Sequence, residues 1–129
     1  GGIPGIPLKI KYPHLKIVLV EVVQKKVDFL ELVIKELGLQ DVEISLLDWR
    51  TFLRKTNYAA DIVCARASLR PDELTRMFKP ASACKDGLLV YWASSDWELP
   101  EAEAKFFVRK EQYDVGDKSR NYFFFKNKL

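Results

Sequence analysis

The chain has 129 residues, 48% of them hydrophobic and 30% charged, which is the balance of one soluble globular domain with a sizeable core. Lys and Arg number 21 against 18 Asp and Glu, and the net charge of +3 permits a nucleic-acid partner without requiring one. The single histidine argues against a zinc site and a His-based triad, and no apolar run approaches the roughly 18 residues of a membrane span.

The first element in the chain is a glycine-rich turn, with Gly1, Gly2 and Gly5, that leads into a short predicted helix. A strand is expected over residues 16–20, closed by Glu21. This order is typical of a nucleotide site in a doubly wound fold, where the strand-tip carboxylate accepts hydrogen bonds from ribose hydroxyls. The usual fingerprint starts on a strand before the glycines, so we expect that strand upstream of this chain. An ordinary loop and a solvated Glu would give the same pattern.

The next segments alternate between strand and helix. Apolar side chains recur at helical spacing from Gln24 to Leu37, and Gly38 stands where a helix C-cap is expected. Asp48 is a suitable N-cap for a further helix. The pattern predicts helices at 7–12, 24–37, 48–55 and from Pro71 to before Pro80, and strands at 15–20, 41–46, 60–65 and 88–93.

The last third of the chain changes character. Ser95 or Asp96 is expected to cap a helix interrupted near Pro100. Residues 106–112 and 122–126 then predict two antiparallel strands joined by a turn at residues 115–118. Without a linker or an internal repeat, residues 1–129 are expected to form a single domain.

The cysteines and the cations give weaker indications. Cys64 and Cys84 lie among apolar neighbours without Cys-x-x-Cys spacing, so we expect buried, reduced thiols in a cytoplasmic protein, with a disulfide as the alternative. Eleven cations would form a surface for a nucleic-acid backbone if they shared a face, although most charge runs are simply solvated. They are Lys9, Lys11, Lys16, Lys25, Lys26, Arg50, Arg54, Lys55, Arg66, Arg70 and Arg76.

Three stretches together carry a resemblance to a known family. They are the opening Gly-Gly-Ile-Pro-Gly-Ile-Pro-Leu, Glu21 with Lys-Lys-Val-x-Phe-Leu at 25–30, and Asp-Ile-Val-Cys-Ala-Arg-Ala at 61–67. The sequence resembles the glucose-inhibited division protein B family, also called small-subunit ribosomal RNA methyltransferase G. The resemblance covers essentially the whole chain, aligned with the C-terminal two thirds of the family, and Pro-Gly-Ile-Pro is its most specific motif.

The resemblance implies the α/β fold of class I S-adenosylmethionine-dependent methyltransferases, with a mostly parallel sheet and a C-terminal antiparallel hairpin. The first strand of that fold is absent here, so the chain is expected to be one methyltransferase domain truncated at its N-terminus. The missing strand would lie between the strand ending at Glu21 and the strand ending at Arg66, so the parallel sheet is expected to be split there.

The resemblance also implies a reaction and its partners. S-adenosyl-L-methionine would be the cofactor, and the N7 atom of one guanine in 16S ribosomal RNA would accept the methyl group. The enzyme is expected to be a monomer that binds 16S ribosomal RNA or the small ribosomal subunit, with no metal and no membrane. Since the N7 lone pair carries no proton, no general base is needed, and positioning would supply most of the catalysis.

Site residues are carried over by position. Arg66 would lie beside the reaction centre as the catalytic and substrate-binding residue, gripping a phosphate or the guanine O6. An arginine at a strand end is otherwise a common partner for a carboxylate. The residues implied for the cofactor are Gly1, Gly2 and Gly5 in the loop, Glu21 for the ribose, and Asp48 and Trp49 for the adenine, partly through their backbone.

Trp92 departs from the family, which usually carries a basic residue at this strand end. With Tyr91 and Trp97 it would suit stacking on an unpaired base, although aromatic residues on a buried strand belong to the core more often. Two alternatives to the enzyme therefore stay open. One is a degenerate relative that binds RNA or ribosomes without catalysis, and the other is a dinucleotide oxidoreductase, suggested by the glycine turn and Glu21.

Overall fold

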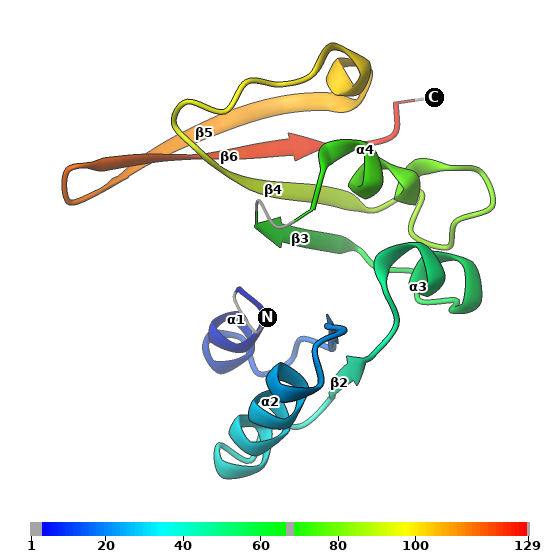
Figure 1. The fold of residues 1–129 in the computed structure, drawn as a ribbon, viewed down its shortest axis with the longest axis vertical. Coiled ribbons are helices and arrows are strands. Elements are labelled where there is room, and N and C mark those ends of the chain that lie inside the picture. Colours follow the sequence, from blue (N-terminus) through cyan, green and yellow to red (C-terminus); the bar gives the residue numbers. More distant parts are fainter. Residues whose placement is uncertain (1–3, 67–68, 129) are drawn as a thin grey trace. The chain divides into compact units, whose positions relative to one another are not determined.

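The computed structural model describes residues 4–66 and 69–128, so Gly1 and Gly2 lie outside the described residues. The chain divides into two compact units, and the boundary along the sequence falls between Phe52 and Leu53 (Figure 1). Its described strands fall in two sheets, so the strand before Glu21 and the strand that ends at Arg66 belong to different sheets, as expected.

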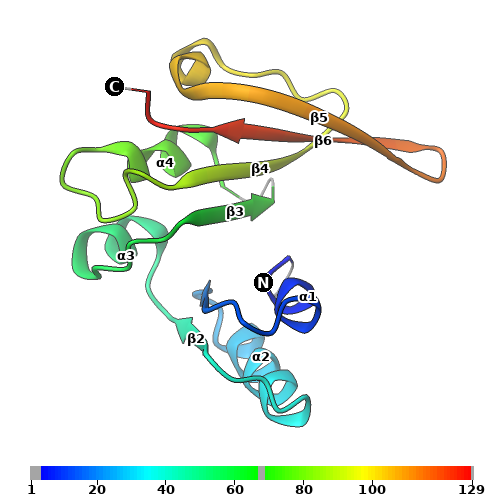
Figure 2. The ribbon, with the colours of Figure 1, turned by 180° about the vertical axis from the view of Figure 1, so that it is seen from behind.

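The N-terminal unit is built on a parallel pair of short strands. Strand β1 pairs with β2 in parallel register from Ile17 opposite Val42 to Val20 opposite Ser45. Helices precede and separate these strands, so that consecutive elements alternate in type (Figures 1 and 2). The elements are α1 (Gly5–Lys11), β1 (Ile17–Val20), α2 (Gln24–Glu36), β2 (Val42–Ser45) and α3 (Trp49–Lys55), the last of which crosses into the second unit.

Helix α2 is ended by a glycine, as its sequence predicted. Gly38 has a φ of +61°, its N–H donates to the carbonyl of Lys35 at 3.1 Å, and the N–H of Leu39 donates to that of Ile34 at 3.0 Å. These two bonds are the Schellman pattern, which satisfies carbonyl groups left open by the helix. The helix buries Val27 and Leu30, which are 1% and 4% exposed.

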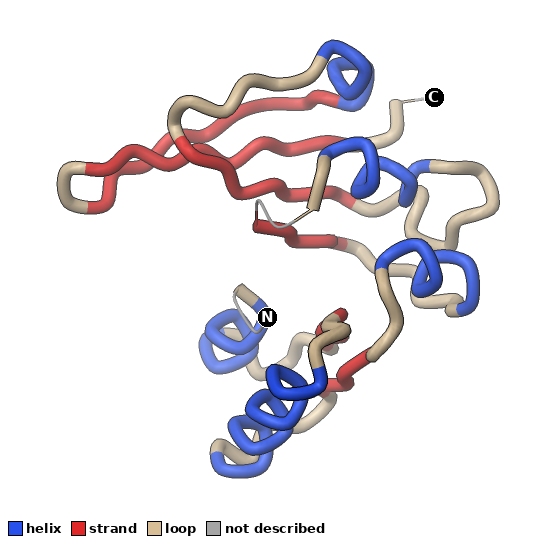
Figure 3. The backbone as a smooth tube through the Cα atoms, viewed as in Figure 1, coloured by secondary structure: helices blue, strands red, loops and turns tan. Residues whose placement is uncertain are grey.

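The C-terminal unit is a mixed sheet with strand order β3-β4-β6-β5 (Figure 3). Strand β3 pairs with β4 in parallel, and β6 pairs antiparallel with both β4 and β5. The hairpin between β5 and β6 turns at Gly116 and Asp117, where the φ of +63° at Gly116 suits the first position of a two-residue type II′ turn. The elements are β3 (Ile62–Arg66), α4 (Pro71–Leu74), the 3-10 helix η1 (Thr75–Phe78), β4 (Leu88–Ser94), the 3-10 helix η2 (Glu101–Phe106), β5 (Phe107–Val115) and β6 (Lys118–Phe125).

One face of this sheet carries the core of the unit. Side chains of β4 and β6 alternate between the two faces, and those directed to the core are at most 5% exposed, among them Leu89, Tyr91, Phe123 and Phe125. Leu74 and Met77, from α4 and η1, are equally buried. This face therefore supplies most of the apolar burial in the C-terminal unit.

Two local expectations were wrong. Ser95 and Asp96 do not cap a helix, because the Ser94 hydroxyl donates to the Asp96 carboxylate at 2.6 Å within a turn, and the helix starts only after Pro100, as η2. Cys64 is exposed rather than buried, because it lies on β3, an outermost strand of its sheet, whereas Cys84 is buried as expected. Helix α1 begins at Gly5, so Pro7 lies in its first turn, as predicted, where N–H groups lack helical partners. The remaining boundaries agree to within four residues, and the largest difference is the start of β6, at Lys118 rather than at residue 122.

We expect Gly87→Ala to lower the free energy of unfolding by about 1–3 kcal/mol, because the new Cβ would lie 2.5 Å from the carbonyl oxygen of Ala60. That oxygen is backbone and cannot move aside like a side chain. Gly38→Asn is the control, since a Cβ there meets nothing within 4 Å and asparagine tolerates a positive φ. Urea unfolding of the full gene product measures both, and equal stability of parent and Gly87→Ala would contradict the close packing.

Candidate functional site

The carboxyl ends of β1 and β2 meet at one edge of the N-terminal unit, because the two strands are parallel. Glu21 follows β1 directly, and its N–H donates to the carbonyl of Ser45 at the end of β2, at 2.9 Å. Asp48 and Trp49 follow β2 after a short loop. Three of the residues predicted to bind the cofactor therefore come from this edge.

The Glu21 carboxylate is held in a fixed place at this edge. Its side chain is buried, and Oε2 accepts hydrogen bonds from the N–H groups of Val22 at 2.9 Å and Val23 at 3.1 Å. Burial alone would raise the pKa of Glu21. The Val23 hydrogen bond, then the positive charge of the chain's amino terminus and last that of Lys26 act against burial, and the pKa lies below its ordinary value. The strand tip thus presents an ionised, oriented acceptor.

Gly5 lies where helix α1 approaches strand β1. A Cβ at this position would be 2.5 Å from Cδ2 of Leu19. The absence of a side chain therefore allows the helix to pack closely on the strand, near the end that leads to Glu21. This is one of the purposes that glycines serve in a nucleotide-binding turn.

The side chains of Asp48 and Trp49 both have structural partners. Asp48 caps α3, since its Oδ1 accepts the N–H of Thr51 at 2.9 Å. The Trp49 ring is 9% exposed and stacks on Phe52 with ring centroids 5.6 Å apart. A ligand contact from Trp49 would therefore use the main chain, which agrees with the partly backbone role expected for this pair.

The second pair of predicted site residues lies in the C-terminal unit. Arg66 ends β3 and is opposite Trp92 on β4, near the carboxyl ends of both parallel strands. The Arg66 guanidinium carbon lies 5.6 Å from the centroid of the Trp92 ring, within the range of a cation–π contact. The structure thus brings together the cation and the aromatic residue that the sequence singled out separately.

Two aromatic residues that the sequence analysis did not select extend this pair. Tyr122 on β6 is opposite Trp92, with ring centroids 5.0 Å apart, and the Tyr113 ring on β5 stacks on Tyr122 at 4.8 Å. Burial and the Tyr113 hydroxyl raise the pKa of Tyr122, whereas Trp92 acts to lower it. Trp92 Nε1 is nonetheless buried without a hydrogen bond of good geometry. These residues are brought together by pairing between strands that are far apart in the sequence. The only signal in the sequence was the alternation of polar and apolar residues along β6.

Other candidates belong to the core or to local structure. Tyr91 is 3% exposed and packs against Trp97, with ring centroids 5.0 Å apart, so the core interpretation is correct for this residue. Lys9 is 3% exposed, and its ammonium donates to the carbonyls of Pro13, at 2.7 Å, and Leu15. Lys9 therefore stabilises the loop after α1 and does not contribute to a phosphate-binding surface.

Within the part of the chain that the structure describes, no group of three or more His, Cys, Asp or Glu is placed to hold a metal ion. The same residues include no helix that is long and apolar enough to cross a membrane.

Comparison with known proteins shows which family the chain resembles over most of its length. The family model described as rRNA small subunit methyltransferase G matches residues 1–121. The ribosomal RNA small subunit methyltransferase G of Geobacillus sp. (strain WCH70) is 43% identical over 107 residues, which are 81% of this chain and 45% of that protein. That of Geobacillus thermodenitrificans (strain NG80-2) is 36% identical over 111 residues, or 84% of this chain and 47% of that protein.

The chain thus spans slightly less than half the length of these relatives. Among solved structures, a mutant of MtNAS in complex with S-adenosylmethionine matches with a TM-score of 0.67 and 17% identity, over 98% of this chain and 52% of that one. At this identity the likeness concerns the fold alone. The fold is the α/β fold of S-adenosylmethionine-dependent methyltransferases, with a mixed sheet that ends in an antiparallel hairpin.

We expect Glu21→Gln to lower the free energy of unfolding by roughly 1 kcal/mol near neutral pH, because the N–H groups of Val22 and Val23 lose an ionised acceptor. A carboxyl group whose pKa is lowered by folding stabilises the protein above its unfolded pKa and loses that effect as pH falls. The difference between parent and variant should therefore shrink below about pH 4.5, the ordinary value. Urea unfolding across pH measures it, and a difference independent of pH would contradict the role of the charge.

Proposed function

Because the chain belongs to the rRNA small subunit methyltransferase G family, we propose that it is part of an enzyme that methylates the N7 atom of a guanine in 16S ribosomal RNA. S-adenosylmethionine would be the methyl donor. The observation that carries the proposal is Glu21, a charged acceptor held by main-chain hydrogen bonds at the carboxyl edge of a parallel pair.

The residues at this edge fit the cofactor. An ionised carboxylate is the acceptor that two ribose hydroxyls require, and its attachment to Val22 and Val23 fixes it without help from the ligand. Gly5 keeps α1 close to the strand, and the main chain at Asp48 and Trp49 would hold the adenine. Gly1 and Gly2 would complete the loop.

The chemistry asks little of the protein beyond positioning. Bound S-adenosylmethionine supplies an electrophilic methyl group, and the N7 lone pair needs no proton removed before it attacks. Holding two reactants in near-attack geometry is worth about 7–11 kcal/mol in favourable cases. The guanine gains positive charge as it is methylated, so Arg66 would serve by gripping the guanine O6 or a phosphate, and Trp92 by contacting the base.

A second function is favoured by one observation, Trp92 at the position where the family usually carries a basic residue. The indole packs between Arg66 and Tyr122, so its position is fixed by contacts on both sides. A relative that binds RNA or ribosomes without catalysis would suit this departure. The dinucleotide oxidoreductase rested on the glycine turn and Glu21 alone, and the family match accounts for both.

Calorimetric titration of the full gene product with S-adenosylhomocysteine tests the cofactor. We expect one-to-one binding, no binding of NADH, and a roughly 10- to 100-fold weaker affinity in Glu21→Gln, since hydrogen bonds to a charged acceptor are replaced. Glu98→Gln is the control, because it removes an exposed carboxylate in the other unit. A folded protein that binds neither ligand would overturn the proposal.

Transfer of a labelled methyl group to small-subunit RNA tests the reaction. We expect 7-methylguanosine as the product. Arg66→Ala should react about 10- to 100-fold more slowly, because the target base is no longer held by the guanidinium, and the rate of Arg66→Lys should lie between those of the parent and Arg66→Ala. Affinity for S-adenosylhomocysteine should stay at the parental value in both variants. Another methylated nucleoside would contradict N7 as the target, and no turnover by a protein that binds the cofactor and RNA would favour the non-catalytic relative.

A further inference from the structure

The aromatic ladder, defined as Trp92, Tyr122 and Tyr113, crosses the C-terminal sheet on the face opposite its core. Trp92 and Tyr122 are direct partners on β4 and β6, and Tyr113 on β5 is a diagonal neighbour of Tyr122. Arg66 on β3 continues the row by its contact with Trp92. Because β3 and β5 are the two outermost strands, this row extends from one edge of the sheet to the other.

Neighbouring rings of the aromatic ladder are in contact, and the ladder ends at Tyr113. The planes of Tyr113 and Tyr122 are inclined by 20° with centroids 4.8 Å apart, which is a stacked arrangement. All three rings are half-buried, whereas the aromatic residues on the core face, such as Tyr91 and Phe123, are buried. Tyr113 lies on β5, and among the described strands none pairs with the outer edge of β5, so the stack ends at Tyr113 on this side.

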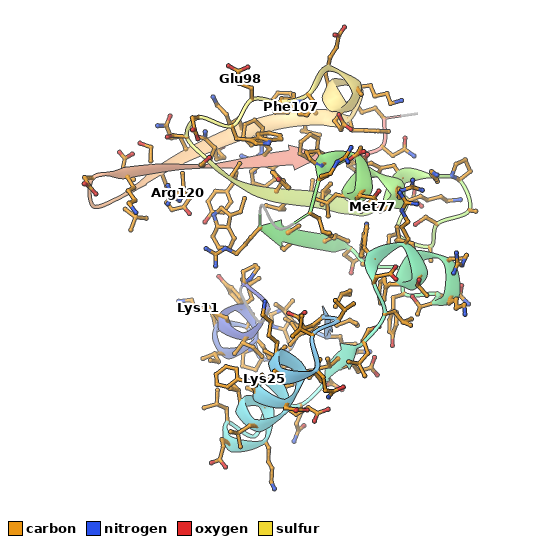
Figure 4. All side chains as sticks on the ribbon, in the orientation of Figure 1. Lys11, Lys25, Met77, Glu98, Phe107 and Arg120 are labelled. Carbon is orange, nitrogen blue, oxygen red and sulfur yellow. The ribbon has the colours of Figure 1, made fainter. Side chains whose placement is uncertain are left out.

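Cations gather on the same face as the ladder. Side chains alternate along β5 and β6, so Arg120, the register partner of Tyr113, shares a face with Tyr122, and so does Lys118. Arg120 is labelled on the hairpin in Figure 4. Arg109 is on this face as well, but it lies over the Phe124 ring and pairs with Glu111. Glu111, the register partner of Tyr122, is an acid on this face, and it is the partner of Arg109. Asp114 belongs to the opposite face, where it accepts a hydrogen bond from the Ser119 hydroxyl at 2.6 Å.

Arg120 is placed at the carboxyl edge of the sheet. It is opposite Ser94, the last residue of β4, and one of its terminal nitrogens donates to the carbonyl of Ser119 at 3.1 Å. Its charge also attracts Asp96. Trp92 is two residues earlier on β4, so the cation of the hairpin and the proposed target-binding pair lie at the same end of the strands.

We propose that this face binds a single-stranded segment of RNA, with an unpaired base stacked on the end of the aromatic ladder at Tyr113 and a phosphate held by Arg120. Aromatic stacking beside cations is the arrangement by which proteins hold unpaired nucleotides. The inference rests on the proposed function, since it gives the RNA substrate a path from Arg66 and Trp92 across the sheet to the closing hairpin. Arg66, Arg120 and Lys118 outnumber Glu111 on this face, and Glu111 is already paired with Arg109, so the net positive charge favours a polyanion over a neutral peptide or protein surface.

Binding of a fluorescein-labelled, unpaired oligoribonucleotide of mixed sequence to the full gene product tests the proposal. We expect Tyr113→Ala and Tyr122→Ala to weaken binding roughly 5- to 150-fold, the effect of losing one stacked base, and Tyr113→Phe and Tyr122→Phe to retain it. Arg120→Gln should lower the slope of log affinity against log salt by about 0.7, as one phosphate contact on a single strand does. A fully paired duplex of the same sequence should be insensitive to the tyrosine variants, because its bases are not available for stacking.

Matched controls separate this face from the rest of the molecule. Phe29→Ala removes an exposed aromatic side chain of α2, and Lys85→Gln removes an exposed cation of the loop before β4, at the opposite end of that strand from Ser94, so neither should change RNA binding. Circular dichroism and S-adenosylhomocysteine binding should remain parental in every variant used. If the tyrosine variants fold and bind S-adenosylhomocysteine but bind RNA as the parent does, the ladder proposal is wrong while the proposed function stands.

Nitration of tyrosine by tetranitromethane gives an independent readout. We expect Tyr113 to react in the full gene product and to be protected when the oligoribonucleotide is bound. A Tyr113 that does not react in the absence of RNA would show that other residues of the full gene product cover this face, which would also overturn the inference. Loss of S-adenosylhomocysteine binding by the parent protein would count against the proposed function instead.

Discussion

The hydrogen bond from Glu21 N–H to the Ser45 carbonyl is the constraint on which the N-terminal unit depends. It extends the parallel pairing one residue beyond β1 and fixes the direction in which the chain leaves the strand. The Glu21 side chain then turns back onto the N–H groups of Val22 and Val23, the two residues before α2. One residue thus completes a strand, orders the turn that follows it and places a negative charge near the positive end of a helix.

This double use explains how a carboxylate can be ready for a ligand. A free glutamate would lose side-chain freedom on binding a ribose, at a cost of up to about 1.5–2 kcal/mol. Glu21 has already lost that freedom in the folded chain, through bonds made within three consecutive residues. The same hydrogen bonds favour its ionised form. The ionised carboxylate therefore both stabilises the turn and would bind the ribose.

The sequence predicted what local rules determine and missed what strand pairing determines. Gly38, Asp48 and Gly116 were identified from helix-capping and turn preferences, and each has the predicted role because such preferences act within a few residues. The prediction of a helix after Ser95 was wrong, because a hydroxyl and a carboxylate can stabilise a turn as well as cap a helix. Arg66 and Trp92 were selected as separate residues, and their contact, like that of Trp92 with Tyr122, follows from register that one sequence does not reveal.

The contact between Arg66 and Trp92 bears on what the departure at Trp92 means. A guanidinium that lies over an indole uses its face, while its N–H donors project in the plane of the group, so stacking and hydrogen bonding to a base or phosphate are compatible. Replacing a basic residue by tryptophan at the end of β4 therefore need not remove the positive charge from this edge, since Arg66 remains beside it and Arg120 is opposite Ser94. In the proposed reaction, which would need no general base, an aromatic residue beside a cation would change how the target is held and would leave the chemical step itself unchanged. This reasoning favours an altered mode of substrate binding over a loss of catalysis.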